Sequence, residues 1–313
     1  MKTYIMIDIG GTKIRAAVFP ARGITALHVK RIRTQCENQS SLERLIELIH
    51  RIWPKKHRVV AIVIAVPGLL DLNKGMVLSA VNIPGWINLP LKQIIEGKFK
   101  TPTYLGNDAS FAAYGEWRHG AGKGHHNLIF LTISTGIGGG IIINDRLLTG
   151  SRGFATELGH VTIQPKGPIC SCGHRGHLEA LASGTAISKY VQKKLTRGGK
   201  STLNAFHPPT AKQIATAAQQ GDLLAKKAFN RAGKFLGIAI ANYLHIFNPT
   251  CVILGGGVSL SGDILFKPLN RSLAQNILNP EYLHKVVITP AKLKDDAGLI
   301  GALEYVRDFS KTK

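Results

Sequence analysis

Cysteine and histidine side chains that could bind a metal ion are concentrated in one short segment. Two thiols and two imidazoles fall within residues 170–177 and another imidazole precedes them, the five being Cys170, Cys172, His174, His177 and His160. Four nitrogen and sulfur ligands suit tetrahedral Zn²⁺, and a shell made only of protein ligands is typical of a structural site. The spacing therefore predicts structural zinc and leaves open whether His174 or His177 completes the shell. Free thiols beside surface histidines are the alternative interpretation.

Two glycine-rich turns, each after an apolar segment, could bind phosphate. Their sequences are Asp8-Ile9-Gly10-Gly11-Thr12-Lys13 and Thr135-Gly136-Ile137-Gly138-Gly139-Gly140. Backbone N–H groups in such turns can bind phosphate oxygens, and Asp8 could hold hydrated Mg²⁺. Neither turn is a Walker A loop or a dinucleotide-binding fingerprint. One turn alone would be explained by a hairpin that needs positive φ, but two in corresponding places favour phosphate binding.

Strands and helices predicted from hydrophobic spacing must position these residues. Strands are expected at 3–9, 15–19, 59–66, 103–105, 127–134, 141–143, 251–254 and 286–288, with a glycine turn at 136–140. Helices are expected at 42–52, with Ser40 or Ser41 as N-cap, and at 108–117, 212–246 and 299–309. Each half begins with a strand, a glycine turn and a returning strand. The pattern predicts a duplicated α/β fold whose halves divide near residue 110, with a cleft between them.

The composition favours a soluble globular protein. The chain has 313 residues, of which 44% are hydrophobic, enough for one large or two ordinary domains. It opens without the pattern of a signal peptide, and its longest uncharged apolar run, 59–70, is too short to span a bilayer. We therefore expect a cytoplasmic protein with no membrane partner.

The net charge is strongly positive. Lysine and arginine number 40 against 18 acidic residues, which gives a formal charge of +22. Such a charge favours anionic partners, such as nucleotides, polyphosphate or nucleic acid. The basic residues are scattered in short groups, and the sequence has no recognition helix or RNA-binding motif. We interpret the charge as a general habit of the source organism and expect no specific nucleic-acid partner.

Taken together, the motifs resemble the signature of the ROK family of repressors and sugar kinases. The matching segments are 8–13, 107–116, 131–140, 153–160, 170–180, 254–257 and 298–302, and the resemblance extends over essentially the whole chain. The resemblance implies an actin-like ATPase (ribonuclease H-like) fold of two domains with the sugar in an interdomain cleft. The small domain would be 1–110, with the C-terminal helix 297–313 packing back on it, and the large domain, 111–296, would carry the zinc loop.

The resemblance also implies an activity, the ATP-dependent phosphorylation of a hexose. Glucose, converted to glucose 6-phosphate, is the first choice, while N-acetylmannosamine, fructose, mannose, allose and polyphosphate as donor stay open. Catalytic Mg²⁺ and a homodimer or homotetramer are implied as well. A repressor of this family would carry a helix-turn-helix segment before the Asp8 motif, which begins seven residues after the start. A nicotinamide dehydrogenase would need a Rossmann fingerprint, which the sequence lacks.

Individual roles follow from the same resemblance. It makes Asp108 the general base, and the expected sugar contacts are Gly68, Asn107, Asp108, Glu157, His160 and Glu179. The expected contacts to ATP and its phosphates are Asp8, Gly10, Gly11, Thr12, Lys13, Thr135, Gly136, Gly256 and Gly257. The implied zinc ligands are His160, Cys170, Cys172 and the residue at position 177, usually cysteine in the family and His177 here.

Asp108 is expected to begin a helix, where the helix dipole favours its ionised form. Helix capping is the alternative role, but capping alone does not explain the adjacent Asn107. His160 would give one ring nitrogen to zinc and the other N–H to a sugar oxygen. Zinc would then shape the sugar pocket without touching phosphate.

Overall fold

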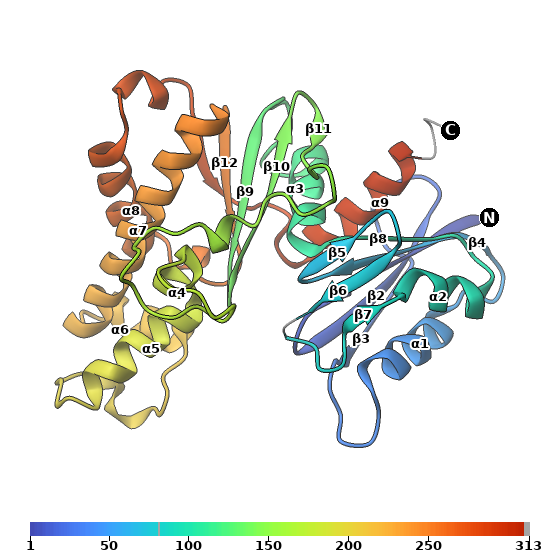
Figure 1. The fold of residues 1–313 in the computed structure, drawn as a ribbon, viewed down its shortest axis with the longest axis horizontal. Helices are drawn as coiled ribbons and strands as arrows, with labels where there is room; N and C mark the ends of the chain where they lie inside the picture. Colours follow the sequence, from blue (N-terminus) through green and yellow to red (C-terminus); the bar gives the residue numbers. More distant parts are fainter. Residues whose placement is uncertain (81, 310–313) are drawn as a thin grey trace.

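Two five-stranded sheets form the framework of the computed structural model, which describes residues 1–80 and 82–309 (Figure 1). The first sheet consists of β1 (Lys2–Ile9), β2 (Lys13–Pro20), β3 (His28–Arg33), β4 (Arg58–Val66) and β8 (Thr103–Asn107). The second consists of β9 (Leu128–Ile133), β10 (Ile137–Ile143), β11 (Arg146–Leu147), β12 (Cys251–Gly255) and β13 (Val287–Pro290). A third, small sheet contains β5 (Leu69–Asp71), β6 (Met76–Ser79) and β7 (Ile87–Leu89).

The α-helices account for most of the remaining structure. They are α1 (Ser41–Ile52), α2 (Leu91–Phe99), α3 (Asp108–His119), α4 (Leu178–Ala182), α5 (Gly184–Leu195), α6 (Ala211–Gln219), α7 (Leu223–Phe247), α8 (Asp263–Asn276) and α9 (Ala297–Phe309). A short 3₁₀ helix, η1 (Leu158–His160), lies before the cysteine-rich loop. Among the described residues, no helix is long and apolar enough to cross a membrane.

The two large sheets have the same topology. Their strand orders are β3-β2-β1-β4-β8 and β11-β10-β9-β12-β13. In each, three antiparallel strands are followed by two that run parallel to the first strand of the half. This repetition confirms the predicted α/β class and the internal duplication.

Helix α3 joins the two halves of the molecule (Figure 1). Its Phe111 packs with α9 against the first sheet, whereas Ala113 and Tyr114 pack against the second. The outer faces are covered by α1 and α2 on the first sheet and by α4 to α8 on the second. The predicted boundary near residue 110 falls within α3, and the division into two domains there stays a prediction. Residues 310–313 of the predicted C-terminal helix lie outside the described residues.

Local sequence signals explain several elements that position the site. The apolar run of β4 is buried because helices cover both faces of its sheet. Helix α1 begins after Ser40, one of the two N-caps that the sequence predicts, and Ser40 also forms a capping box with Glu43. The helix predicted over 212–246 is instead divided into α6 and α7. The break occurs because Gly221 adopts a φ of 101° and Asp222 caps α7 through the Ala225 N–H.

The glycine turn predicted at 136–140 is wrong in its extent. The chain turns only between Ser134 and Gly136, and β10 begins at Ile137. Residues 138–140 pair with β9 in regular antiparallel register. These three glycines are therefore part of a strand and are not needed to form a turn.

Close packing on both faces of β10 explains why glycine occupies these positions. A Cβ on Gly139 would lie 2.6 Å from the Leu158 side chain of η1. On the other face, a Cβ on Gly140 would lie 2.5 Å from the Ala113 Cβ of α3 and 3.0 Å from the α3 backbone. The absence of side chains lets α3 and η1 approach one strand from opposite faces.

We predict that Gly140→Ala destabilises the protein by about 1–3 kcal/mol, because the added methyl group overlaps α3. Urea unfolding measures the change. Gly97→Ala in α2 is the matched control, since nothing lies within 4 Å of a Cβ there. If both substitutions leave stability equally unchanged, the close approach of α3 to β10 is not a packing constraint.

Candidate active site

A cavity of about 940 Å³ lies where the two sheets and α3 meet. It is lined by the β1–β2 turn, the start of α3, the residues after β12 and the start of α9. The sequence-predicted residues that it brings together are Asp8, Gly10, Gly11, Thr12, Lys13, Asp108, Thr135, Gly256 and Gly257. The other predicted phosphate contact, Gly136, lines an adjoining groove together with Thr135 and Glu179.

Asp108 and Asn107 begin α3 but hold its N-terminus in different ways. The Asn107 side chain is the N-cap, because its Oδ1 accepts the Ser110 N–H at 3.0 Å. Asp108 Oδ1 accepts the N–H of the next residue, Ala109, at 2.8 Å. Asn107 thus supplies the cap, and capping does not account for Asp108.

The sequence predicts that the start of the helix favours the ionised form of Asp108, and in the structure a larger effect opposes this. Burial raises its pKa, although backbone N–H groups at the helix start act in the opposite direction. The helix terminus was expected to favour the ionised form, but loss of water around the carboxylate outweighs that effect. A raised pKa suits a group that takes a proton near neutral pH.

Asp8 is a second carboxyl group in this cavity and, like Asp108, is half-buried. Burial and the negative charge of Asp108 raise its pKa to about 7, while the nearby Arg15 guanidinium acts in the opposite direction. The two carboxyl groups come from the ends of β1 and β8, which flank β4 in one sheet. The structure therefore concentrates negative charge at this edge of the first sheet.

Glu157 approaches Asp108 from the second half of the molecule. Burial and the negative charges of Asp108 and Glu179 raise the pKa of Glu157, and His160 lowers it. The Glu157 Oε2 lies 3.9 Å from the His160 Nε2. The preceding residue, Thr156, has a φ of 72°, which is strained for a β-branched side chain. Asp108, His160 and Glu179 thus all lie near enough to Glu157 to influence its charge.

The predicted metal-binding residues also come together. Their ligand atoms all lie within 4.8 Å of one another, and we call this set the Cys–His cluster: His160, Cys170, Cys172 and His177. The His160 Nδ1 is 3.4 Å from the His177 Nδ1 and 3.7 Å from the Cys170 Sγ. A tetrahedral zinc site places its ligand atoms about 3.3–3.8 Å apart, so the donor set and its spacing fit Zn²⁺. His174 lies outside this set and stacks on the ring of His177.

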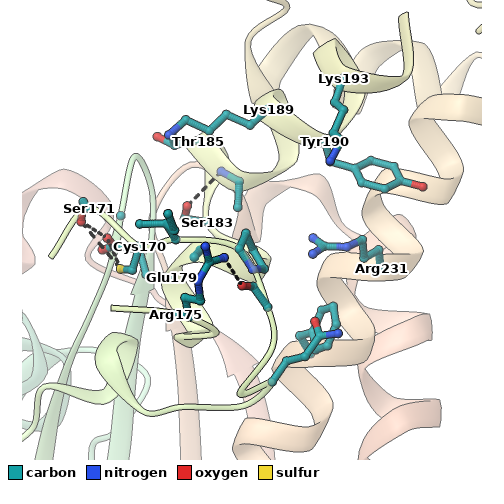
Figure 2. A pocket seen from close by; sticks show the side chains of 18 of the residues that line it. Cys170, Ser171, Arg175, Glu179, Ser183, Thr185, Lys189, Tyr190, Lys193 and Arg231 are labelled. Atoms are coloured by element: carbon teal, nitrogen blue, oxygen red, sulfur yellow. Dashed lines mark hydrogen bonds between the residues drawn. The ribbon is translucent and has the colours of Figure 1, made fainter. Parts of the chain in front are cut away.

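Glu179 connects the Cys–His cluster to the second glycine turn. Its Oε2 accepts the Ile137 N–H at 3.0 Å, and its Oε1 accepts the Ser171 hydroxyl at 2.6 Å (Figure 2). The carboxylate therefore braces the loop that carries Cys170 against the start of β10. Oε1 also accepts the Cys170 thiol at 3.5 Å, so Oε2, which has one partner, is the oxygen that can also accept a substrate hydroxyl.

Gly68 lies near Asn107. It follows β4, whose last residue, Val66, pairs in register with Asn107 at the end of β8. Gly68 and Asn107 are therefore at the same edge of the first sheet. The φ of 100° at Gly68 explains the residue type.

Two parts of the site were not predicted from the sequence. Arg15, assigned only to a strand, is 9% exposed, lines the cavity and pairs with Asp296 at 2.5 Å. An arginine inside a buried strand directly after the Asp8 motif was a usable signal. A second cavity of about 1040 Å³ shares Thr135 and Gly257 with the first and is walled by α5 and α6. Its walls come from separate segments, and no single motif marks it.

The chain belongs to the ROK family, whose sequence profile matches residues 4–308. It is similar to a glucokinase from Thermotoga maritima, with 36% identity over 97% of each chain. It is also similar to an N-acetylmannosamine kinase from Yersinia pseudotuberculosis, with 35% identity over 97% of this chain and 98% of the other.

The structural comparison agrees with the sequence comparison. A ROK family glucokinase from Streptomyces griseus in complex with glucose and AMPPNP superposes with a TM-score of 0.84 and 33% identity. The superposition covers 98% of this chain and 99% of the other. The predicted family and the two-domain actin-like ATPase fold are thereby confirmed.

The charge of Asp8 predicts a pH-dependent stability. Its pKa is about 7 in the folded protein against an ordinary value of 3.8, so ionisation favours the unfolded state. The stability that the protonated group confers is complete below about pH 4 and is lost as the pH rises to 7. Asp8→Asn should therefore raise the free energy of unfolding by about 2–4 kcal/mol at pH 8 and by little at pH 4.

Urea unfolding of the ligand-free protein at both pH values measures this difference. Glu37→Gln, at an exposed position, is the control for loss of one negative charge. Equal effects of Asp8→Asn at pH 4 and pH 8 would contradict a half-buried, protonated Asp8.

Proposed function

We propose that the protein is an ATP-dependent hexose kinase that phosphorylates glucose at its 6-hydroxyl group. The observation that carries the proposal is the position of Asp108, half-buried between the cavity with the glycine turns and the Glu157–His160 turn. The similarity to glucokinases, one of them in complex with glucose and an ATP analogue, supports the same activity. The N-acetylmannosamine kinase relative supports a second candidate substrate.

In this mechanism Asp108 is the general base. The 6-hydroxyl oxygen attacks the γ-phosphorus, the bond to the bridging oxygen breaks, and ADP leaves. The hydroxyl proton passes to Asp108, and because the Ala109 N–H already binds Oδ1, we assign the proton to Oδ2. Glu157, His160, Glu179, Asn107 and the backbone at Gly68 would hold the other sugar hydroxyls and so fix which oxygen reaches Asp108.

ATP would occupy both cavities. The glycine turn at 10–12, Thr135 and the residues 256–257 offer backbone and hydroxyl donors to the phosphates, and the second cavity has the volume for the nucleoside. Asp8 fits a hydrated Mg²⁺, because a half-buried carboxyl group beside a phosphate site needs a cation to stay ionised. When bound, Mg²⁺ neutralises the developing charge on the phosphates.

Zinc would have a structural role in the Cys–His cluster. The cluster holds His160 by Nδ1, which leaves Nε2, near Glu157, to face the sugar. Zinc thus positions a sugar-binding side chain and takes no part in phosphoryl transfer. A cytoplasmic location, a homodimer or homotetramer, and a role in glycolysis stay predictions.

Substitution of the base tests the mechanism. Asp108→Asn keeps the shape of the side chain and the hydrogen bond to Ala109 but cannot accept a proton. We expect kcat to fall more than about a hundredfold, because general-base catalysis contributes 10²–10⁴-fold. Glucose binding, measured by calorimetry, should change by less than about threefold, since the sugar hydroxyls keep their other partners.

Asp263→Asn is the matched control, because it makes the same exchange at the exposed first residue of a helix, α8, outside both cavities, and should leave kcat unchanged. A kcat above one hundredth of wild type in Asp108→Asn would contradict the assignment of Asp108 as base. A screen of ADP release with glucose, N-acetylmannosamine, fructose, mannose and allose identifies the preferred hexose, and a repeat with polyphosphate tests the donor.

Loss of zinc is expected to weaken sugar binding. Cys172→Ser should release the metal, loosen the loop that holds His160 and raise KM for glucose about tenfold, with a smaller change in KM for ATP. Zinc content by atomic absorption and steady-state kinetics measure both effects.

Cys36→Ser, an exposed cysteine far from the cluster in sequence, is the control. His177→Ala should lose zinc and His174→Ala should retain it. Unchanged glucose kinetics in a zinc-free preparation would refute the structural role.

A further inference from the structure

A groove of about 1070 Å³ lies on the second half of the molecule, beside the Cys–His cluster and between α5 and α7 (Figure 2). Six basic residues line it, and we call it the basic groove: Lys166, Arg175, Lys189, Lys193, Arg231 and Lys234. Its lining includes one acidic residue, Glu179, whose oxygens already bind the Ile137 N–H and the Ser171 hydroxyl. The proposed catalytic cavity is different, because four basic residues there face four acidic ones.

None of the six basic side chains forms a salt bridge with another of the described residues. Like charges gathered in a concave site repel one another and attract anions more strongly than the same charges on a flat surface. The groove is therefore an electrostatic site for which the described residues supply no counter-charge.

Arg231 shows that the groove is a built site and not only an exposed charged face. It is half-buried, and burial lowers its pKa. Its guanidinium donates to the Leu181 carbonyl oxygen at 2.7 Å and stacks on Tyr190 at 5.3 Å and Phe235 at 5.0 Å. Figure 2 shows it directed toward the middle of the groove, between Arg175 and Tyr190. A cation fixed in this way is preorganised to bind an anion.

The lining also indicates which kind of anion fits. Single-stranded nucleic acid binds through aromatic faces on which bases stack, but Arg231 already covers Tyr190 and Phe235. A chain of phosphate groups needs only closely spaced cations, and the groove supplies these along its length. At one end it reaches Thr135, which also borders the two cavities assigned to ATP, and its Lys189 and Lys193 also line the second of these cavities.

We propose that the basic groove binds a linear chain of phosphate groups at a site separate from the nucleotide. The groove is separate because Lys166, Arg231 and Lys234 line it and do not line either ATP cavity. Binding there does not depend on the hexose kinase activity, and it gives part of the +22 charge a specific ligand.

Calorimetric titration of inorganic polyphosphate into the protein saturated with AMPPNP tests the proposal. We expect binding with AMPPNP present, and a dissociation constant raised about tenfold in Lys166→Gln/Lys234→Gln, because each lost cation removes one phosphate contact. Arg231→Gln should weaken binding at least as much. If Arg231→Gln does not fold, Lys166→Gln/Lys234→Gln still tests the proposal, because both of these lysine side chains lie at the surface.

Lys55→Gln/Lys56→Gln is the matched control, since both side chains are exposed, lie outside the groove and remove the same net charge. We expect this control pair to change the dissociation constant for polyphosphate by less than about twofold, because the proposal attributes binding to the groove and not to the net charge. Three results would overturn the proposal: complete displacement of polyphosphate by AMPPNP, equal weakening in the control pair, or single-stranded RNA of equal charge binding as tightly as polyphosphate.

Discussion

Three carboxyl groups lie near one another between the two halves, and the rest of the site is arranged around them. Asp8 and Asp108 are half-buried, whereas the Glu157 side chain is 45% exposed. Asp8 and Asp108 come from one edge of the first sheet, and Glu157 approaches from the second half. Burial raises the pKa of each. Carboxylates that lose water are less favourable, so burial shifts each of these groups toward its protonated form. Ligands that bring cations and hydroxyl donors relieve this cost, which makes the site selective for them.

The glycines of β10 allow these carboxyl groups to lie close together. Because residues 138–140 have no side chains, α3 and η1 lie against opposite faces of one strand. Asp108 is the first residue of α3, and Glu157 immediately precedes η1. Larger residues in β10 would move the two carboxyl groups apart, so the packing of an apparently structural strand sets the electrostatics of the site.

Much of this site could be predicted from the sequence where the signal is local. The Cys–His cluster is recognisable because most of its ligands lie within eight residues, and the Asp8 turn because it follows a clear apolar strand. The burial of Asp108 could not be predicted, since it depends on α9 and on the second sheet, and so the helix dipole was given too much weight. The extent of the second glycine turn was also wrong, because the same glycines suit a turn and a tightly packed strand.

The basic groove could not be predicted for a related reason. Its cations come from three separate segments, and Lys189 and Lys193 are spaced like the solvated face of any helix. Only the fold places them opposite Arg175 and Arg231. From the sequence, the positive charge therefore looked like a property of the whole chain. In the structure, part of that charge is concentrated in the basic groove.

Charge is thus separated between two neighbouring sites. Acidic groups balance basic ones in the cavity between the halves, and basic groups are in excess in the groove beside it. In the proposed assignment, a phosphate in the first site would lie beside the carboxyl group of Asp8, and a divalent cation between them would favour its binding. A phosphate in the groove, where basic residues are in excess, would need no metal. We therefore expect anion binding to depend more on Mg²⁺ in the cavity than in the groove.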